Sequence, residues 1–300
     1  MVDNKRALIF MSIGVVGISF AAAFVRWSGV SAGLSAFYRL FYGTLSLFLM
    51  ISFMHIRSKK YSIYKSIPSD LIKKSFLAGL FLGVDLYIWH ISILMIGSGL
   101  ATVIANTQVF HTVIIGSFFL GEKLDWKWKL ILPIAFIGVG LIAVKDFNIE
   151  VDTDFIIGTS YSVVAGFLYA IFLYFTKSIR GKYESIPSIV TWFYITFFCF
   201  VTITVLNLFD GYIQFDIGLE SHAVLFTLGL ITTAISWVLI SRAISVLPLI
   251  KTSFMLLGQP VLATVWGVLF FEEYLTTLQM IGLVITVSML FYGQFLKIKS

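Results

Sequence analysis

The chain has 300 residues, of which 59% are hydrophobic and only 12% are charged, and its mean hydropathy is +0.98. Soluble domains are close to half apolar and a quarter charged, so this composition excludes a soluble protein and indicates an integral membrane protein. The net charge of +6 does not indicate a nucleic-acid partner, because the basic residues follow the connections between apolar segments.

Apolar segments of about twenty residues recur along the whole chain, which is the length that a helix needs to cross a hydrocarbon core of about 30 Å. The weak alternation of a membrane β-barrel is absent from the sequence. The sequence therefore predicts an all-α integral membrane protein with ten transmembrane helices and short connections. The expected spans are 7–27, 33–56, 71–96, 98–120, 126–144, 155–178, 188–209, 221–246, 248–271 and 275–296.

Lys and Arg alternate between the two sets of connections, as the positive-inside rule requires. The basic set includes Lys5, Arg6, Arg57, Lys59, Lys60, Lys65, Lys73, Lys74, Lys123, Lys127, Lys129, Lys177, Arg180, Lys182, Arg242, Lys251, Lys297 and Lys299. The other set holds mainly acids, which are Asp146, Glu150, Asp152, Asp154, Asp210, Asp216, Glu220, Glu272 and Glu273. The alternation predicts a multi-pass protein of the cytoplasmic membrane with both termini in the cytoplasm.

The segment "NTQVFHTVIIGSFFLGEKLDWKWK" from Asn106 aligns without gaps with "LGQPVLATVWGVLFFEEYLTTLQM" from Leu257. The matched pairs are Gln108 with Gln259, Glu122 with Glu273, Leu124 with Leu275, and Asp125 with Thr276. The last pair offers two good N-cap residues for the spans that follow. We expect two five-helix repeats, 1–148 and 149–300, which are inverted because five is an odd number of crossings. Secondary transporters use this design and bind substrate near the midplane.

Several stretches resemble the first half of EamA-type carriers of the drug/metabolite transporter superfamily, namely "SFAAAFVRW", "AFYRL", "DLYIWHISI" and "NTQVFHTVIIGSFFLGEKL". The stretch "LGQPVLATVWGVLFFEEYLT" resembles the matching part of the second half. The resemblance covers nearly the whole chain and implies a ten-span, five-plus-five carrier of metabolites, including amino acids, often directed outward. Val109 stands where such carriers often have proline, so we expect a weaker kink in span four.

Ionisable and polar residues inside the spans are the candidate site, because an intramembrane charge is costly. Depth, counted at about 1.5 Å per residue, puts Asp85, Gln108, His111 and Gln259 near the middle of their spans. Helical spacing places Asp85, Trp89 and Ser92 on one stripe of span three, and Gln108 with His111 on one stripe of span four. The predicted substrate-binding residues are Asp85, Trp89, Gln108, His111 and Gln259, with Asp85 also the candidate for proton coupling.

Each candidate also has a structural interpretation. The carboxyl of Asp85 would then belong to a buried polar network, Trp89 to packing, and Gln259 to backbone repair next to Pro260. The secondary candidates, for which a structural role weighs as much or more, are Arg39, His90, Asn106, Glu122 and Glu273. Of these, Glu122 and Glu273 are expected to anchor loops or cap backbone groups at helix ends.

The sequence contains no Walker-type phosphate loop, no Cys/His cluster with metal spacing and no serine elbow. We therefore expect no catalytic residues, no metal and no cofactor.

The predicted function is alternating-access, secondary-active transport of a small organic metabolite, such as an amino acid, outward across the cytoplasmic membrane. The expected partners are this solute, the bilayer and protons, and the chain is a monomer or homodimer. The alternatives are an intramembrane enzyme acting on a lipid-soluble substrate, or an uptake carrier for a nucleotide-like metabolite.

Overall fold

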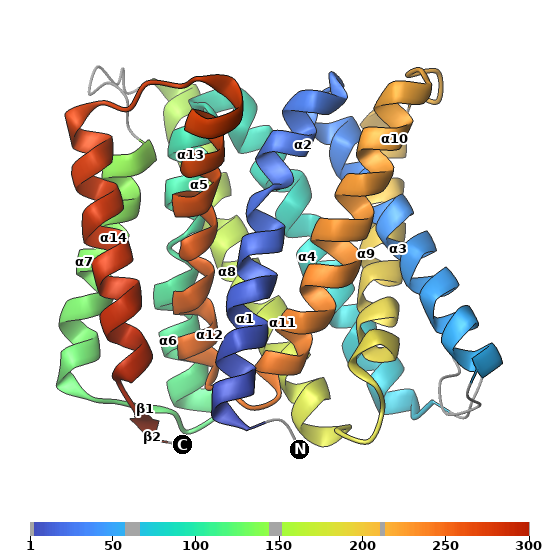
Figure 1. Cartoon of the computed structure of the whole chain (residues 1–300), viewed down its shortest axis with the longest axis horizontal. Helices are drawn as coiled ribbons and strands as arrows, with labels where there is room; N and C mark the ends of the chain where they lie inside the picture. Colours follow the sequence, from blue (N-terminus) through green and yellow to red (C-terminus); the bar gives the residue numbers. More distant parts are fainter. Residues whose placement is uncertain (1–2, 58–66, 144–151, 211–213, 300) are drawn as a thin grey trace. The chain divides into compact units, whose positions relative to one another are not determined.

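The computed structural model describes residues 3–57, 67–143, 152–210 and 214–299 (Figure 1). Within these ranges the regular secondary structure is helical apart from one pair of two-residue strands, and short turns and loops connect the helices. Nine helical segments of the described residues are long and apolar enough to cross a membrane. The fifth expected span, 126–144, corresponds to the 18-residue helix α7 (Trp126–Ala143), which is not among these nine. The chain is thus an all-helical membrane protein, as predicted.

Two compact units make up the chain, and each draws on both halves of the sequence. Unit 1 comprises Met1–Val84 and Phe175–Leu247, and unit 2 comprises Asp85–Tyr174 and Pro248–Ser300. The expected repeat boundary at 148/149 lies outside the described residues and stays a prediction. The same holds for the structure around five residues of the charge pattern, which are Lys59, Lys60, Lys65, Asp146 and Glu150.

Unit 1 contains the first three spans and the seventh and eighth, with two of its helices extending into unit 2. Its elements are α1 (Asn4–Ser19), α2 (Ala21–Ser28), α3 (Ala32–Arg57), the first part of α4 (Ser69–Ile96), the end of α8 (Thr153–Lys182), α9 (Ser188–Asp210), α10 (Leu219–Leu228), η1 (Gly229–Ile235) and α11 (Ser236–Ile244). The eighth span is continuous but contains the π-helix η1 at its centre. Because Gly229 has no side chain, the backbone of α3 at Arg39–Gly43 approaches closely at this point.

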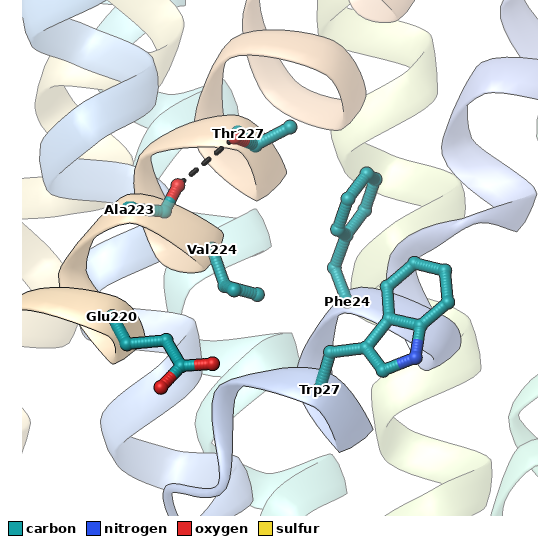
Figure 2. Close-up of a pocket in the computed structure, with 6 residues that line it drawn as sticks. All are labelled: Phe24, Trp27, Glu220, Ala223, Val224 and Thr227. Carbon is teal, nitrogen blue, oxygen red and sulfur yellow. Dashed lines mark hydrogen bonds between the residues drawn. The ribbon is translucent and has the colours of Figure 1, made fainter.

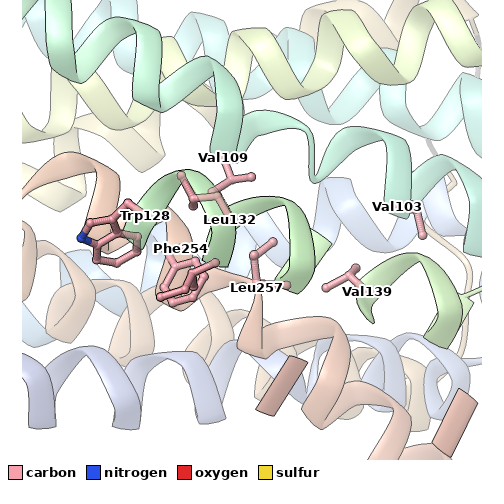
Figure 3. Packing of buried hydrophobic residues seen from close by; sticks show 9 residues of the cluster. Val103, Val109, Trp128, Leu132, Val139, Phe254 and Leu257 are labelled. Carbon is pink, nitrogen blue, oxygen red and sulfur yellow. The ribbon is translucent and has the colours of Figure 1, made fainter. Parts of the chain in front are cut away.

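Unit 2 contains the fourth, fifth, ninth and tenth spans. Its own elements are α5 (Ser98–Ala105), α6 (Gln108–Phe119), β1 (Lys123–Leu124), α7, α12 (Leu249–Leu256), α13 (Gly258–Phe271), α14 (Thr277–Phe295) and β2 (Ile298–Lys299). A buried apolar cluster joins α6, α7 and α12, where Trp128 packs edge-on against Phe254 at 5.1 Å between ring centroids and Val109 lies nearby (Figure 3).

The helices α7 and α14 lie side by side and run in opposite directions (Figure 1). Glycine makes this contact close, because a Cβ on Gly282 would lie only 2.6 Å from the Gly138 carbonyl oxygen. The strand β1, which precedes α7, pairs antiparallel with β2, which follows α14. Since α7 and α14 occupy equivalent places in the two halves, their antiparallel arrangement is what an inverted repeat requires.

The boundaries of the helices in unit 2 repeat along the chain. The helix α5 spans Ser98–Ala105 and α12 spans Leu249–Leu256, so both ends are displaced by 151 residues. The same displacement relates Gly121 to Glu272, and both adopt the left-handed conformation, with φ of 68° and 53°. An exposed left-handed glutamate is uncommon, so the shared turn reflects the repeat and not the residue type.

The expected weaker kink in span four stays a prediction, but the lack of a proline does not prevent an interruption there. The fourth span is interrupted between α5 and α6 in the same way as the ninth is between α12 and α13, although it has Val109 instead of a proline. Two local features replace the proline. The Asn106 side chain donates to the Thr102 carbonyl at 2.8 Å, and Gly166 of α8 leaves room for the turn, because a Cβ there would lie 2.5 Å from the Ala105 carbonyl oxygen.

Candidate functional site

The helix interruption between α5 and α6 carries a group of polar atoms that the described protein atoms leave without a hydrogen-bond partner. They are Thr107 Oγ1, Gln108 Oε1 and His111 Nδ1, all buried from solvent. We call these three residues the polar cluster. Buried polar atoms are almost always paired in native proteins, so three such atoms within five residues mark a place that suits a polar ligand or bound water.

The polar cluster faces α8. The His111 ring lies 5.6 Å, centroid to centroid, from the ring of Phe167, in an edge-on arrangement. A Cβ on the adjacent Gly166 would lie 3.1 Å from the Gln108 amide nitrogen. The start of α6 and the middle of α8 are therefore held against each other, and the small residue on α8 makes this approach possible.

The stripe of α4 that carries Asp85 also faces α8. Ser92 donates to the Gly158 carbonyl at 2.8 Å and lies 2.5 Å from Ser162 Oγ. Met95 and Ile96 pack on Gly158, so α4 and α8 run antiparallel, with Ile96 near Gly158 and Ser92 near Ser162. One helical turn along α4 from Ser92, about 5.4 Å, is Trp89, which therefore lies close to the level of Gly166 on α8. Asp85 lies one turn further along α4.

Asp85 is 6% exposed and makes no hydrogen bond or ion pair with any described residue. Burial without a partner is costly for a carboxyl group. Trp89 is half-buried on the same stripe. Its neighbour His90 has a local role, because its Nδ1 lies 2.5 Å from the Leu86 carbonyl oxygen of the preceding turn. Asp85 thus differs from His90 in having no described structural function.

Gln259 is the repeat counterpart of Gln108, and each lies at the start of the second half of an interrupted span. Gln108 is the first residue of α6, and Gln259 is the second residue of α13. Gln108 is buried and Gln259 is half-buried. Arg39, in contrast, belongs to unit 1, where its Nε donates to Thr233 Oγ1 of η1 at 3.1 Å.

Glu122 caps a helix. Its carboxylate is 3% exposed and accepts hydrogen bonds from the backbone amides of Leu249 at 2.5 Å and Ile250 at 3.0 Å, at the start of α12. Glu273, its repeat counterpart, follows α13. The backbone amide of Glu273 donates to the Gly267 carbonyl, and the amide of Glu122 donates in the same way to the Gly116 carbonyl. Both carboxylates lie beside the corresponding glycine.

Sequence reasoning missed the contribution of α8. Ser162 and Gly158 lie 70 and 66 residues after Ser92, and no motif connects them. A cluster of small residues on one face of the sixth span was the available signal, because small residues allow membrane helices to approach closely. Thr107 was also missed, since its hydroxyl joins the polar cluster only because the helix is interrupted there.

Among the described residues, no group of three or more His, Cys, Asp or Glu side chains could hold a metal ion.

Comparison with known proteins gives three results. Residues 5–144 and 156–292 each match the sequence profile of the EamA-like transporter family. A protein of known crystal structure superposes with a TM-score of 0.77 at 13% sequence identity, over 97% of this chain and 96% of the other, and this likeness shows the fold alone. No curated protein sequence matches the chain.

Proposed function

Because this chain belongs to the EamA-like transporter family, we propose that it exports a small organic metabolite, such as an amino acid, across the cytoplasmic membrane by alternating access. Membership of this family makes it a multi-pass transporter of small metabolites and not an enzyme. The observation that carries the proposal further is the polar cluster, whose unpaired buried atoms suit a polar solute.

In this proposal Gln108 and His111 hydrogen-bond the solute, and Gln259 does so from the equivalent position of the second repeat. A glutamine amide offers both a donor and an acceptor, and a neutral histidine offers one of each, so the set suits a solute with amino and carboxyl groups. Trp89 supplies an apolar wall on the Asp85 stripe. The helix interruptions add free backbone groups near these side chains, a device common in transporters.

Asp85 carries the coupling proton or the counter-charge for an amino group in this scheme. The support is its burial and the lack of any partner among the described residues. Both roles need a carboxylate, and they differ in the effect of Asp85→Asn. If Asp85 carries the proton, this variant still exchanges solute but no longer accumulates it along a proton gradient. If Asp85 is the counter-charge, the variant no longer binds the solute.

The charge pattern supports the orientation, with both termini and the basic connections in the cytoplasm.

The binding site can be tested before the solute is known. A panel of amino acids and related metabolites is screened for compounds that raise the unfolding temperature of the purified chain. The stabilising compound should fail to protect Gln108→Ala and His111→Ala, yet still protect Gln294→Ala, an amide on α14 away from the cluster. Equal protection of all four proteins would place the solute elsewhere.

A further inference from the structure

A pocket of about 370 Å³ opens between α2 and α10 in unit 1 (Figure 2). Phe24 and Trp27 line it from α2, and Glu220, Ala223, Val224 and Thr227 line it from α10. The volume falls in the range of small-molecule sites. The four residues of α10 follow helical spacing and so form one stripe that faces α2.

The orientation of this stripe is fixed by contacts on another face of α10. There, His222 Nδ1 lies 2.9 Å from the Tyr42 hydroxyl of α3, and its ring contacts Tyr38 edge-on at 5.2 Å. On the other side of the pocket, Phe24 and Trp27 form an edge-on pair at 5.5 Å between centroids. The α10 stripe is therefore held in place by packing outside the pocket, and the aromatic wall by the contact between its own two rings.

The chemistry of the lining is one-sided. Glu220 is exposed and makes no hydrogen bond or ion pair with the residues that the structure describes. The Thr227 hydroxyl donates to the Ala223 carbonyl at 2.9 Å, so it is already engaged (Figure 2). None of the lining residues is basic. A carboxylate beside two aromatic rings attracts a cation, through its charge and through the negative faces of the rings. The same groups repel an anion.

From this arrangement we propose that the pocket binds a primary ammonium group attached to an apolar body. The ammonium lies at Glu220 and over the aromatic pair, and the apolar body contacts Val224 and the Trp27 ring. This site is separate from the polar cluster of unit 2, and the proposal holds whatever solute the protein transports.

The place of the pocket along the spans leaves two sources for this ammonium. Trp27 is the next-to-last residue of the span Asn4–Ser28, and Glu220 is the second residue of the span Leu219–Ile244. The pocket therefore lies at the level of the membrane–water interface, where aromatic side chains commonly lie. A soluble amine reaches this level from water, and an aminophospholipid presents its headgroup there.

The test measures binding of tryptamine to the purified full chain in phosphatidylcholine nanodiscs by ligand-observed NMR, with tryptophol as the neutral analogue. We expect tryptamine to bind and tryptophol to bind at least about fivefold more weakly, since a cation–π and charge contact of about 1 kcal/mol corresponds to that factor. Glu220→Gln and Trp27→Leu should each weaken tryptamine binding by a similar factor. Glu272→Gln, an exposed carboxylate in unit 2, should leave it unchanged.

Nanodiscs that contain phosphatidylethanolamine distinguish the two sources. Competition with tryptamine assigns the pocket to the lipid headgroup, and unchanged tryptamine binding assigns it to a soluble amine. Equal binding of tryptamine and tryptophol, or wild-type binding by Glu220→Gln, would overturn the proposal. The result of the solute screen in the polar-cluster variants does not affect this test, because tryptamine binding is measured directly and needs neither the solute nor transport.

Discussion

Replacing Glu122 by alanine should strongly destabilise unit 2. The residue preceding α12 is Pro248, which offers no side-chain cap, so Glu122 supplies the acceptors for the first amides of this helix. Leu249 and Ile250 are both fully buried, and without Glu122 their N–H groups have no replacement acceptor from water. Helix termini leave these donors free, and burying them unpaired is costly.

The magnitude follows from the two bonds. A hydrogen bond to a charged group contributes about 1.5–3 kcal/mol, so losing both should lower the free energy of unfolding by about 3–6 kcal/mol. Glu122→Gln keeps one acceptor oxygen and should cost about half as much. Glu272→Ala removes an exposed carboxylate and should change the free energy of unfolding by less than about 0.5 kcal/mol.

Thermal unfolding of the purified variants, followed by tryptophan fluorescence, measures this effect. Buried Trp128 lies against Phe254 of α12, so its emission reports on the affected region. The reactivity of Cys199, which is buried in α9, shows in the same samples whether unit 1 unfolds together with unit 2. If Glu122→Ala and Glu272→Ala unfold at the same temperature, the capping interpretation of Glu122 is wrong.

Three further predictions concern packing, capping and topology. Gly282→Ala should lower the unfolding temperature at a cost of about 1–3 kcal/mol, because its Cβ would lie 2.6 Å from backbone, whereas Gly140→Ala, with its nearest atom at 4.0 Å, should be neutral. Thr276→Ala should cost about 1 kcal/mol in the same assay, because the capping box with Gln279 at the start of α14 is lost. A reporter fused after Glu184 should be active in the cytoplasm and one fused near Asp216 outside; the reverse pattern would refute the orientation.

Much of the fold was readable from the sequence because hydrophobicity sets the length of membrane helices. The spans expected at 33–56, 188–209 and 275–296 correspond closely to α3, α9 and α14. The internal repeat was also readable, and the matching bounds of α5 and α12 confirm it. The capping function expected for Thr276 is confirmed by its bond from the Gln279 amide.

The remaining features depend on contacts between helices. The π-helix η1 contains no proline. It begins at Gly229, where the backbone of α3 approaches closely. The interruption before Gln108 depends on Gly166, which is distant in sequence. The candidate site shows the same division: depth and spacing selected Gln108 and His111, while their shared neighbour α8 emerged only from the structure.

Counterflow in proteoliposomes tests the central claim most directly. Vesicles containing the wild-type chain are loaded with the unlabelled solute found in the screen, and uptake of the labelled solute is followed. An alternating-access carrier with its site at the polar cluster predicts labelled uptake that depends on internal solute, with the half-saturating concentration raised in Gln108→Ala. Uptake that is indifferent to internal solute, or an unchanged half-saturating concentration in this variant, would contradict the mechanism or the site.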